Sequence, residues 1–123
     1  MIRELLAVGI GGALGSVARY LISYTLLAGH TLLGFPVGTF TVNAVGSLLI
    51  GVLLSVINSQ TAGWLLVVGF CGGFTTFSTF SVDAVRLLRL EQYGSAALYI
   101  GLSVAICIAF AALGLWIGTN FKN

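Results

Sequence analysis

Charged residues are scarce in this chain. Five Lys and Arg and three Asp and Glu occur among 123 residues, so 7% of the side chains are charged. A soluble domain carries about 25% charged residues, whereas 59% of this sequence is hydrophobic. We therefore expect an integral membrane protein. The net charge of +2 is too small to indicate a nucleic-acid partner.

Histidine and cysteine are equally rare. The single histidine, His30, lies in a predicted loop, and no Ser/His/Asp set or pair of carboxylates falls within an apolar span. The sequence therefore argues against an enzyme. Cys71 and Cys107 both lie inside apolar spans, which favours packing thiols over a disulfide or a metal site. Met1–Glu4 leads into apolar sequence without a cleavage pattern, so we expect a helix there, not a cleaved signal.

Long apolar runs dominate what is present. A membrane-spanning helix needs roughly 20 mostly apolar residues, and four such spans fit, at about 5–28, 37–57, 62–83 and 95–118. The only proline, Pro36, suits the first turn of the second span. The connections, at 30–35, 58–61 and about 87–94, leave no room for a soluble domain. The prediction is an all-α membrane protein with a single four-helix domain over residues 1–123.

The basic residues give almost no orientation signal. Four spans place both termini on one side, together with Arg3 and Lys122, while Arg86 and Arg89 fall on the other side. Since Lys and Arg near the span ends set the topology, this balance predicts insertion in both orientations and assembly as an antiparallel homodimer. The alternative is that a weak bias, such as the N-terminal amine, still fixes one orientation.

Seventeen glycines indicate close helix packing. Residues 11–15 contain a GxxxG pattern, and Gly9 and Gly46 extend the set of small residues. Membrane helices associate largely through close backbone approach, because lipid supplies little hydrophobic drive between them. The alternative is that glycine is simply common in membrane helices, and the sequence does not say which helices touch.

The most unusual segment is 69–81, which reads GFCGGFTTFSTFS. It combines four phenylalanines, five hydroxyl side chains and three glycines within the third apolar span. Irregular or polar backbone at membrane depth is tolerated only where it is buried in protein or lines a cavity. We therefore predict a break in the third helix near residues 72–76 and place the function there.

Phe77 and Phe80 are three residues apart and share a face if the sequence after the break is helical. Such aromatic pairs usually only pack, but the edge of a phenyl ring carries partial positive charge and can face a small anion. Neighbouring hydroxyls can donate hydrogen bonds to the same anion. These hydroxyl candidates, for the pathway or for supporting the break, are Thr75, Thr76, Ser78, Thr79 and Ser81.

Two polar residues in the first two spans need a reason, since intramembrane polar groups are costly. Arg19 has three interpretations: its long stem reaches the interface, it lines an aqueous vestibule and attracts an anion, or it pairs with Asp83. Asn43 has two: its amide makes an interhelical hydrogen bond, or it presents an NH2 donor to a permeating ion.

Tyr99, Ser103 and Cys107 follow one another at intervals of four and form a weakly polar stripe on the fourth span. The alternative for Ser103 is a hydrogen bond to its own backbone. The break in the third helix also frees carbonyl oxygens. If two copies met at a two-fold axis, a carbonyl pair from each would form a four-oxygen site that suits Na⁺.

Three motifs carry a family resemblance: GGALGSVARY at 11–20, GTFTVNAVGSLLIG at 38–51, and the segment 69–81. With these the chain resembles, over essentially its full length, the Fluc (CrcB) family of small fluoride channels. The resemblance implies an antiparallel, dual-topology homodimer with two fluoride pathways in a bacterial plasma membrane. It also implies passive release of cytoplasmic fluoride, with no energy coupling, which lowers fluoride toxicity.

The resemblance also assigns residues. Gly72 and Thr75 match positions whose backbone carbonyls hold a structural Na⁺ at the dimer axis, and Arg19 matches an arginine near the vestibule. Cys107 is a departure, because the family often has a hydroxyl there. The residues that match the fluoride pathway are Asn43, Phe77, Phe80, Tyr99 and Ser103.

Two other functions remain in view. A small multidrug-type exporter would need a membrane-embedded carboxylate to couple protons to its substrate. Glu4 is close to the terminus and Asp83 lies at a helix end, so neither suits that role. A non-transporting subunit of a membrane assembly would show no ion flux at all. Transport measured with and without a proton gradient distinguishes the three candidate functions: channel, exporter and non-transporting subunit.

Overall fold

Four long helices make up nearly all of the computed structural model, which describes residues 1–122. Helix α1 (Ile2–Tyr20) continues into a π-helical segment η1 (Leu21–Leu26), and α2 covers Val37–Val56. The third span consists of α3 (Gln60–Ala62), the π-helical segment η2 (Gly63–Cys71), α4 (Gly72–Phe74) and α5 (Phe77–Arg89). The fourth is α6 (Tyr93–Lys122). The four apolar spans expected from hydropathy are thus confirmed.

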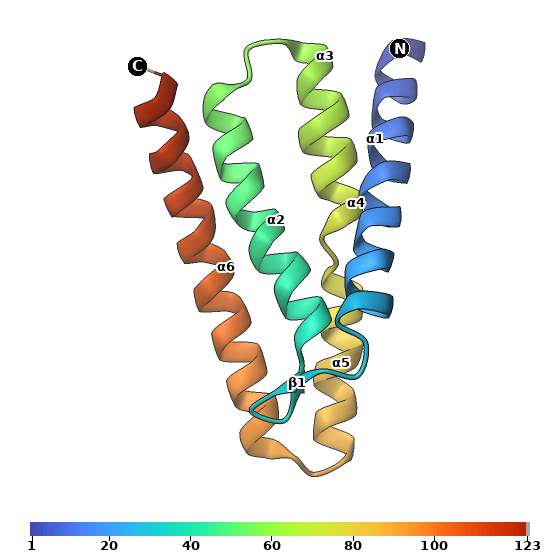
Figure 1. The fold of residues 1–123 in the computed structure, drawn as a ribbon, viewed down its shortest axis with the longest axis vertical. Helices are drawn as coiled ribbons and strands as arrows, with labels where there is room; N and C mark the ends of the chain where they lie inside the picture. The colour runs from blue at the N-terminus through green and yellow to red at the C-terminus, as the bar shows by residue number, and fades with distance from the viewer. Residues whose placement is uncertain (123) are drawn as a thin grey trace.

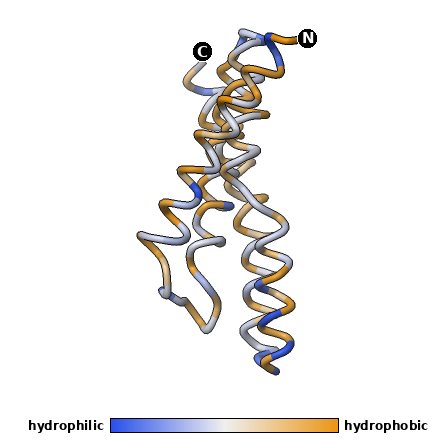
Figure 2. Tube along the Cα trace, turned by 90° about the vertical axis from the view of Figure 1, so that its right-hand side faces the viewer, coloured by the Kyte–Doolittle hydropathy of each residue, from blue (hydrophilic) through white to orange (hydrophobic). Residues whose placement is uncertain are grey.

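The helices form an elongated bundle with both termini at one end, as the even number of spans requires (Figure 1). Helix α2 packs along α6, and α1 packs along η2 and α4. The connection between α5 and α6 lies at the opposite end from the termini. Hydrophobic positions run along most of the bundle, and strongly hydrophilic ones lie mainly toward its ends (Figure 2).

A small β-hairpin interrupts the helical pattern, which the all-α prediction missed. Strands β1 (Thr31–Leu32) and β2 (Phe35–Pro36) pair antiparallel in the loop before α2. The two residues between the strands have φ of 53° and 87°, and a two-residue hairpin turn with both φ positive matches the twist of the strands. The hairpin places Phe35 in the core, with its ring centroid 5.0 Å from that of Tyr99.

The third span ends six residues later than predicted, because α5 runs to Arg89 and not to Asp83. Charged residues at 83, 86 and 89 end the hydropathic signal, but they do not end the helix. Ala84 and Leu87 continue the buried face of α5 and pack in the core with Ala96 of α6. The helical periodicity of apolar residues would therefore have located this boundary better than hydropathy does.

Several glycines lie where helices cross closely. A Cβ added at Gly15 of α1 would lie 2.1 Å from the Phe70 carbonyl oxygen, and one at Gly114 of α6 would lie 2.2 Å from that of Leu48. Neither site has room for a methyl group. The glycine-rich faces therefore hold α1 against the third span and α6 against α2, which answers the question that the sequence left open.

Candidate functional site

The backbone is extended at Thr75 and Thr76, between α4 and α5. Thr75 has φ −91° and ψ 158°, and Thr76 has φ −151° and ψ 118°. The Thr76 hydroxyl accepts a hydrogen bond from the Thr79 N–H at 3.1 Å, the usual role of threonine before the first turn of a helix. The Thr75 hydroxyl donates to the Cys71 carbonyl at 2.9 Å. Hydrogen bonds of these two hydroxyls thus stabilise the end of α4 and the start of α5.

Asn43 of α2 binds this extended backbone with both ends of its amide. Its Nδ2 donates to the Thr76 carbonyl at 3.0 Å, and its Oδ1 accepts from the Thr76 N–H at 2.8 Å. The interhelical bond considered for Asn43 is therefore present. Because Nδ2 carries two hydrogens, one donor remains beyond the bond to Thr76. Asn43 also lines the pocket described below.

Arg19 supports the same region from α1. Its Nε donates to the Gly73 carbonyl at 3.0 Å, so the guanidinium lies against the end of α4. The third interpretation of Arg19, an ion pair with Asp83, is therefore wrong, because the guanidinium binds the Gly73 carbonyl instead. Asp83 instead accepts a hydrogen bond from the Tyr99 hydroxyl at 3.0 Å, and Arg86 lies 3.8 Å from its other oxygen.

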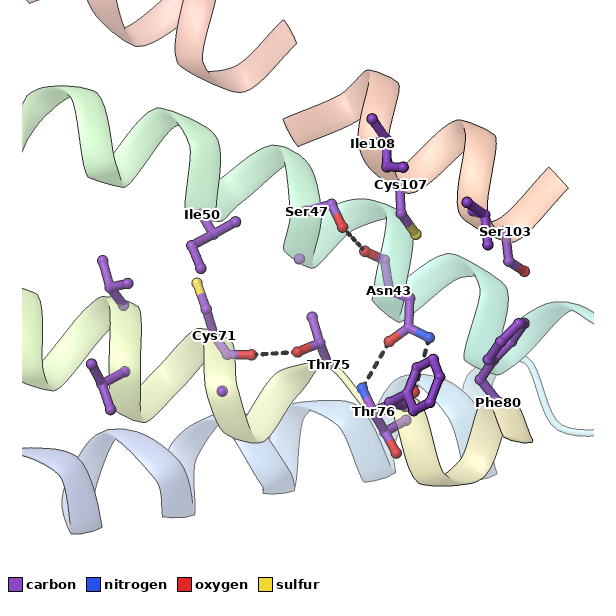
Figure 3. A pocket seen from close by; sticks show the side chains of 16 residues that line it. Asn43, Ser47, Ile50, Cys71, Thr75, Thr76, Phe80, Ser103, Cys107 and Ile108 are labelled. Carbon is purple, nitrogen blue, oxygen red and sulfur yellow. Dashed lines mark hydrogen bonds between the residues drawn. The ribbon is translucent and has the colours of Figure 1, made fainter. Parts of the chain in front are cut away.

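A pocket of about 650 Å³ lies beside the extended segment. It collects residues that the sequence singled out from three separate spans, and no charged side chain is among the described residues that line it (Figure 3). The predicted residues gathered here are Asn43, Gly72, Thr75, Thr76, Phe77, Phe80 and Ser103, together with Cys107.

The two aromatic residues of this pocket lie on one face of α5, as their spacing predicted. The ring centroids of Phe77 and Phe80 are 5.6 Å apart. Phe80 also packs 5.1 Å from Tyr99 and joins the core. Phe77, in contrast, is 78% exposed. Core packing thus fixes the position of Phe80, whereas Phe77 lies exposed at the edge of the pocket.

Ser103 of α6 lines the pocket and is only 5% exposed. Its hydroxyl has no hydrogen-bond partner among the described residues, so the alternative in which it bonds its own backbone is wrong. A buried hydroxyl without a partner costs about 1–3 kcal/mol. Such a group favours a polar occupant in the pocket beside it.

The other predicted residues lie elsewhere. Tyr99 is fully buried against Phe35 and Phe80 and is not among the residues that line this pocket. The Ser81 hydroxyl donates to the Phe77 carbonyl at 2.9 Å. Ser78 and Thr79 line a second hollow, of about 440 Å³, with Asp83 and Arg86.

Two further residues with polar or thiol side chains line the pocket, and the sequence did not assign them to it. Ser47 lies one helical turn after Asn43, and its hydroxyl donates to the Asn43 carbonyl at 2.7 Å. Cys71 precedes the glycine pair of the third span and was interpreted only as a packing thiol. The i, i+4 relation of Ser47 to Asn43 was the available signal for the first, since such residues share a helix face.

Four helices of 20 to 30 residues, each long and apolar enough to cross a bilayer, define a multi-pass membrane protein. Beside its third span lies an uncharged, largely apolar pocket with a few polar side chains. The sequence profile of one family, described as "CrcB-like protein, Camphor Resistance (CrcB)", matches residues 6–115. The chain belongs to this family.

Curated relatives cover nearly the whole chain. A protein of Cereibacter sphaeroides named "Fluoride-specific ion channel FluC" is 49% identical over 119 residues, which are 94% of each chain. A protein of Coxiella burnetii with the same name is 44% identical over 123 residues, 94% of this chain and 97% of the relative. One of Bacteroides fragilis, again so named, is 40% identical over 126 aligned positions, 98% and 99% of the two chains.

Proposed function

We propose that this protein is a fluoride-selective ion channel through which cytoplasmic fluoride leaves the cell down its electrochemical gradient. The names of the relatives point to fluoride. The observation that carries the proposal is the pocket itself, where phenyl rings, an amide and a free buried hydroxyl meet without a charged side chain among the lining residues described.

This combination suits a small anion that must pass and not stay. A full positive charge in a low-dielectric site would hold an anion tightly, whereas a phenyl edge offers only a partial positive charge. The Ser103 hydroxyl and the remaining Asn43 N–H are hydrogen-bond donors that replace part of the anion's water. Fluoride gains most from such donors because it is the smallest halide, which favours it over chloride.

Passive conduction is enough to lower cytoplasmic fluoride. From an acidic medium, fluoride enters cells as neutral HF and ionises in the less acidic cytoplasm. A potential of about 100 mV, negative inside, is worth about 2.3 kcal/mol per elementary charge. At about 1.4 kcal/mol per tenfold change, this keeps cytoplasmic fluoride roughly forty-fold below the outside concentration. The proposed setting is the plasma membrane of a bacterium.

The proposed working form is an antiparallel homodimer inserted in both orientations. Arg3 lies near one end of the chain's bundle and Arg86 and Arg89 near the other, so the charge difference that orients a membrane protein is small. The pocket beside Thr75 and Thr76 has polar backbone that needs cover from lipid. A second copy on this face would supply that cover and complete the pathway.

A structural Na⁺ at the dimer axis is part of the proposal, and the carbonyl arrangement fits it. In an unbroken helix the Thr76 N–H would reach the Gly72 carbonyl, but here it donates to Asn43. The next carbonyl, that of Gly73, accepts a hydrogen bond from Arg19. Gly72, which is exposed and lines the pocket, thus keeps a carbonyl without its helical donor. Oxygen from Gly72 and Thr75 of two copies would suit a hard cation.

The remaining predicted residues receive supporting roles. Arg19 attracts anions toward the vestibule and braces the end of α4, while Tyr99 anchors Phe80 next to the pathway. Thr76 caps α5. The hydroxyls of Ser78, Thr79 and Ser81 support the start of that helix or the approach to the pocket.

Phe77→Ala provides a direct mutational test. Removing this exposed ring should slow fluoride efflux by about tenfold or more, a free-energy change of about 1.4 kcal/mol, because an edge that faces the anion is lost. Core packing should change little, since the side chain is 78% exposed. Efflux from proteoliposomes that contain equal amounts of assembled protein gives the measurement.

Phe121→Ala is the matched control, since Phe121 is 83% exposed and lies near the C-terminus, away from the pocket. It should conduct as the unmodified protein does. Unchanged efflux from correctly assembled Phe77→Ala would remove Phe77 from the pathway. The same comparison for Phe80→Ala needs a stability measurement beside it, because Phe80 packs on the core.

A further inference from the structure

Both cysteines of the chain line the proposed pathway pocket, and their surroundings differ. Cys71, in η2, is 1% exposed, and its sulfur points toward Ile50 (Figure 3). Cys107, on α6, is half-buried, and its sulfur points toward α2 near Asn43. Of the two thiols, Cys107 is the one that a small solute in the pocket can reach.

A second observation marks this side of the pocket as a place for a ligand. Ser103 lies one helical turn before Cys107, and its hydroxyl is buried without a partner among the described residues. The other hydroxyls of the pocket are engaged: Ser47 donates to Asn43, Thr75 donates to Cys71, and Thr76 accepts from Thr79. A free, buried hydroxyl of the pocket therefore lies one helical turn from its accessible thiol.

We propose that Cys107 is a binding site for soft, thiophilic cations such as Hg²⁺, beside the free hydroxyl of Ser103, and that occupancy of this site blocks the pocket. Thiolate sulfur is the preferred protein ligand of soft metals. The binding itself stands on the pocket geometry alone. The block rests on the proposed function, since it requires that ions pass through this pocket.

The chemistry is a simple exchange of ligands. With mercuric chloride, the Cys107 S–H bond and one Hg–Cl bond break, an S–Hg bond forms, and a proton and a chloride ion leave. No atom changes its oxidation state. The reactive form is the thiolate. The added group takes up space in the pocket that Cys107 and Ser103 both line.

The experiment treats the purified protein in proteoliposomes with mercuric chloride and follows two readouts. Intact mass and peptide mapping identify the thiol that carries mercury, independently of any transport. Fluoride efflux is then compared before and after treatment of the same variant. The variants are the unmodified protein, Cys107→Ser and the matched control Cys71→Ser. Added dithiothreitol removes the metal.

We expect mercury on Cys107 in the unmodified protein and in Cys71→Ser, with efflux slowed about tenfold or more, a change of about 1.4 kcal/mol, and restored by dithiothreitol. The treated-to-untreated ratio for Cys107→Ser should stay near one. Mercury on Cys71 alone, or on neither thiol, would overturn the site. Mercury on Cys107 with unchanged efflux would overturn the block. If untreated protein released no fluoride, the proposed function and the block would fail together, and the mass result would still decide the binding site.

Discussion

Replacing Gly114 with alanine should destabilise the folded chain by about 3 kcal/mol, a shift of roughly 100-fold in the ratio of folded to unfolded protein. The added Cβ would lie 2.2 Å from the Leu48 carbonyl oxygen and 2.9 Å from the Val52 nitrogen. Both contacts are backbone atoms of α2, which cannot turn away as a flexible side chain can. Helices α2 and α6, which pack extensively against each other, must therefore move apart. Unfolding in mixed detergent, followed by tryptophan fluorescence, measures the loss.

Gly101→Ala is the control on the same helix. A Cβ at Gly101 meets nothing within 4 Å, and alanine is favoured over glycine in a helix by about 1 kcal/mol. This variant should be as stable as the original protein or slightly more so. Equal stability of Gly114→Ala and Gly101→Ala would show that the α2–α6 contact does not depend on close backbone approach.

Asn43→Leu should remove fluoride conduction and also destabilise the chain. Leucine has a similar size but leaves the Thr76 N–H and carbonyl without their partner on α2. Two unsatisfied backbone groups cost about 1–3 kcal/mol each, so a loss between about 2 and 6 kcal/mol is expected. Because Thr76 also caps α5, Phe77 and Phe80 lose their fixed position at the pocket. Unfolding free energy and fluoride efflux are measured on the same preparation.

Two further variants separate the roles of Asn43. Asn43→Asp keeps the acceptor for the Thr76 N–H but loses the donor to its carbonyl, so an intermediate loss of stability is expected. Ser47→Ala removes another polar group of the pocket, whose hydroxyl donates to a carbonyl of its own helix, and stability should hardly change. If Asn43→Leu lost conduction at full stability, Asn43 would serve the ion alone and not the helix junction.

Hydropathy located the four spans because a helix that crosses a bilayer must be long and apolar, which sequence shows directly. Hydropathy failed at the end of α5, where Asp83, Arg86 and Arg89 lower the local average while the helix continues. The hairpin before α2 also escaped prediction. Its stability depends on Phe35 reaching a core built from α5 and α6, and such a distant partner is not visible in the local pattern.

The pocket was predictable in its residue types but not in its connections. The phenylalanine and hydroxyl pattern of residues 69–81 pointed to a segment that lines the pocket. The bond between Asn43 and Thr76 joins residues 33 positions apart, and that of Arg19 to Gly73 joins residues 54 positions apart. Sequence spacing on one helix predicts neighbours three or four residues away, whereas contacts between helices depend on how the glycine faces pack.

Fluoride efflux from proteoliposomes loaded with potassium fluoride tests the central claim most directly. Valinomycin clamps the potential, a fluoride electrode follows release, and vesicles loaded with potassium chloride serve as the control. We predict fast fluoride release, no chloride release, and no dependence on an imposed proton gradient. Absence of fluoride release from well-assembled protein would contradict the channel, and release only with a proton gradient would indicate a coupled exporter instead.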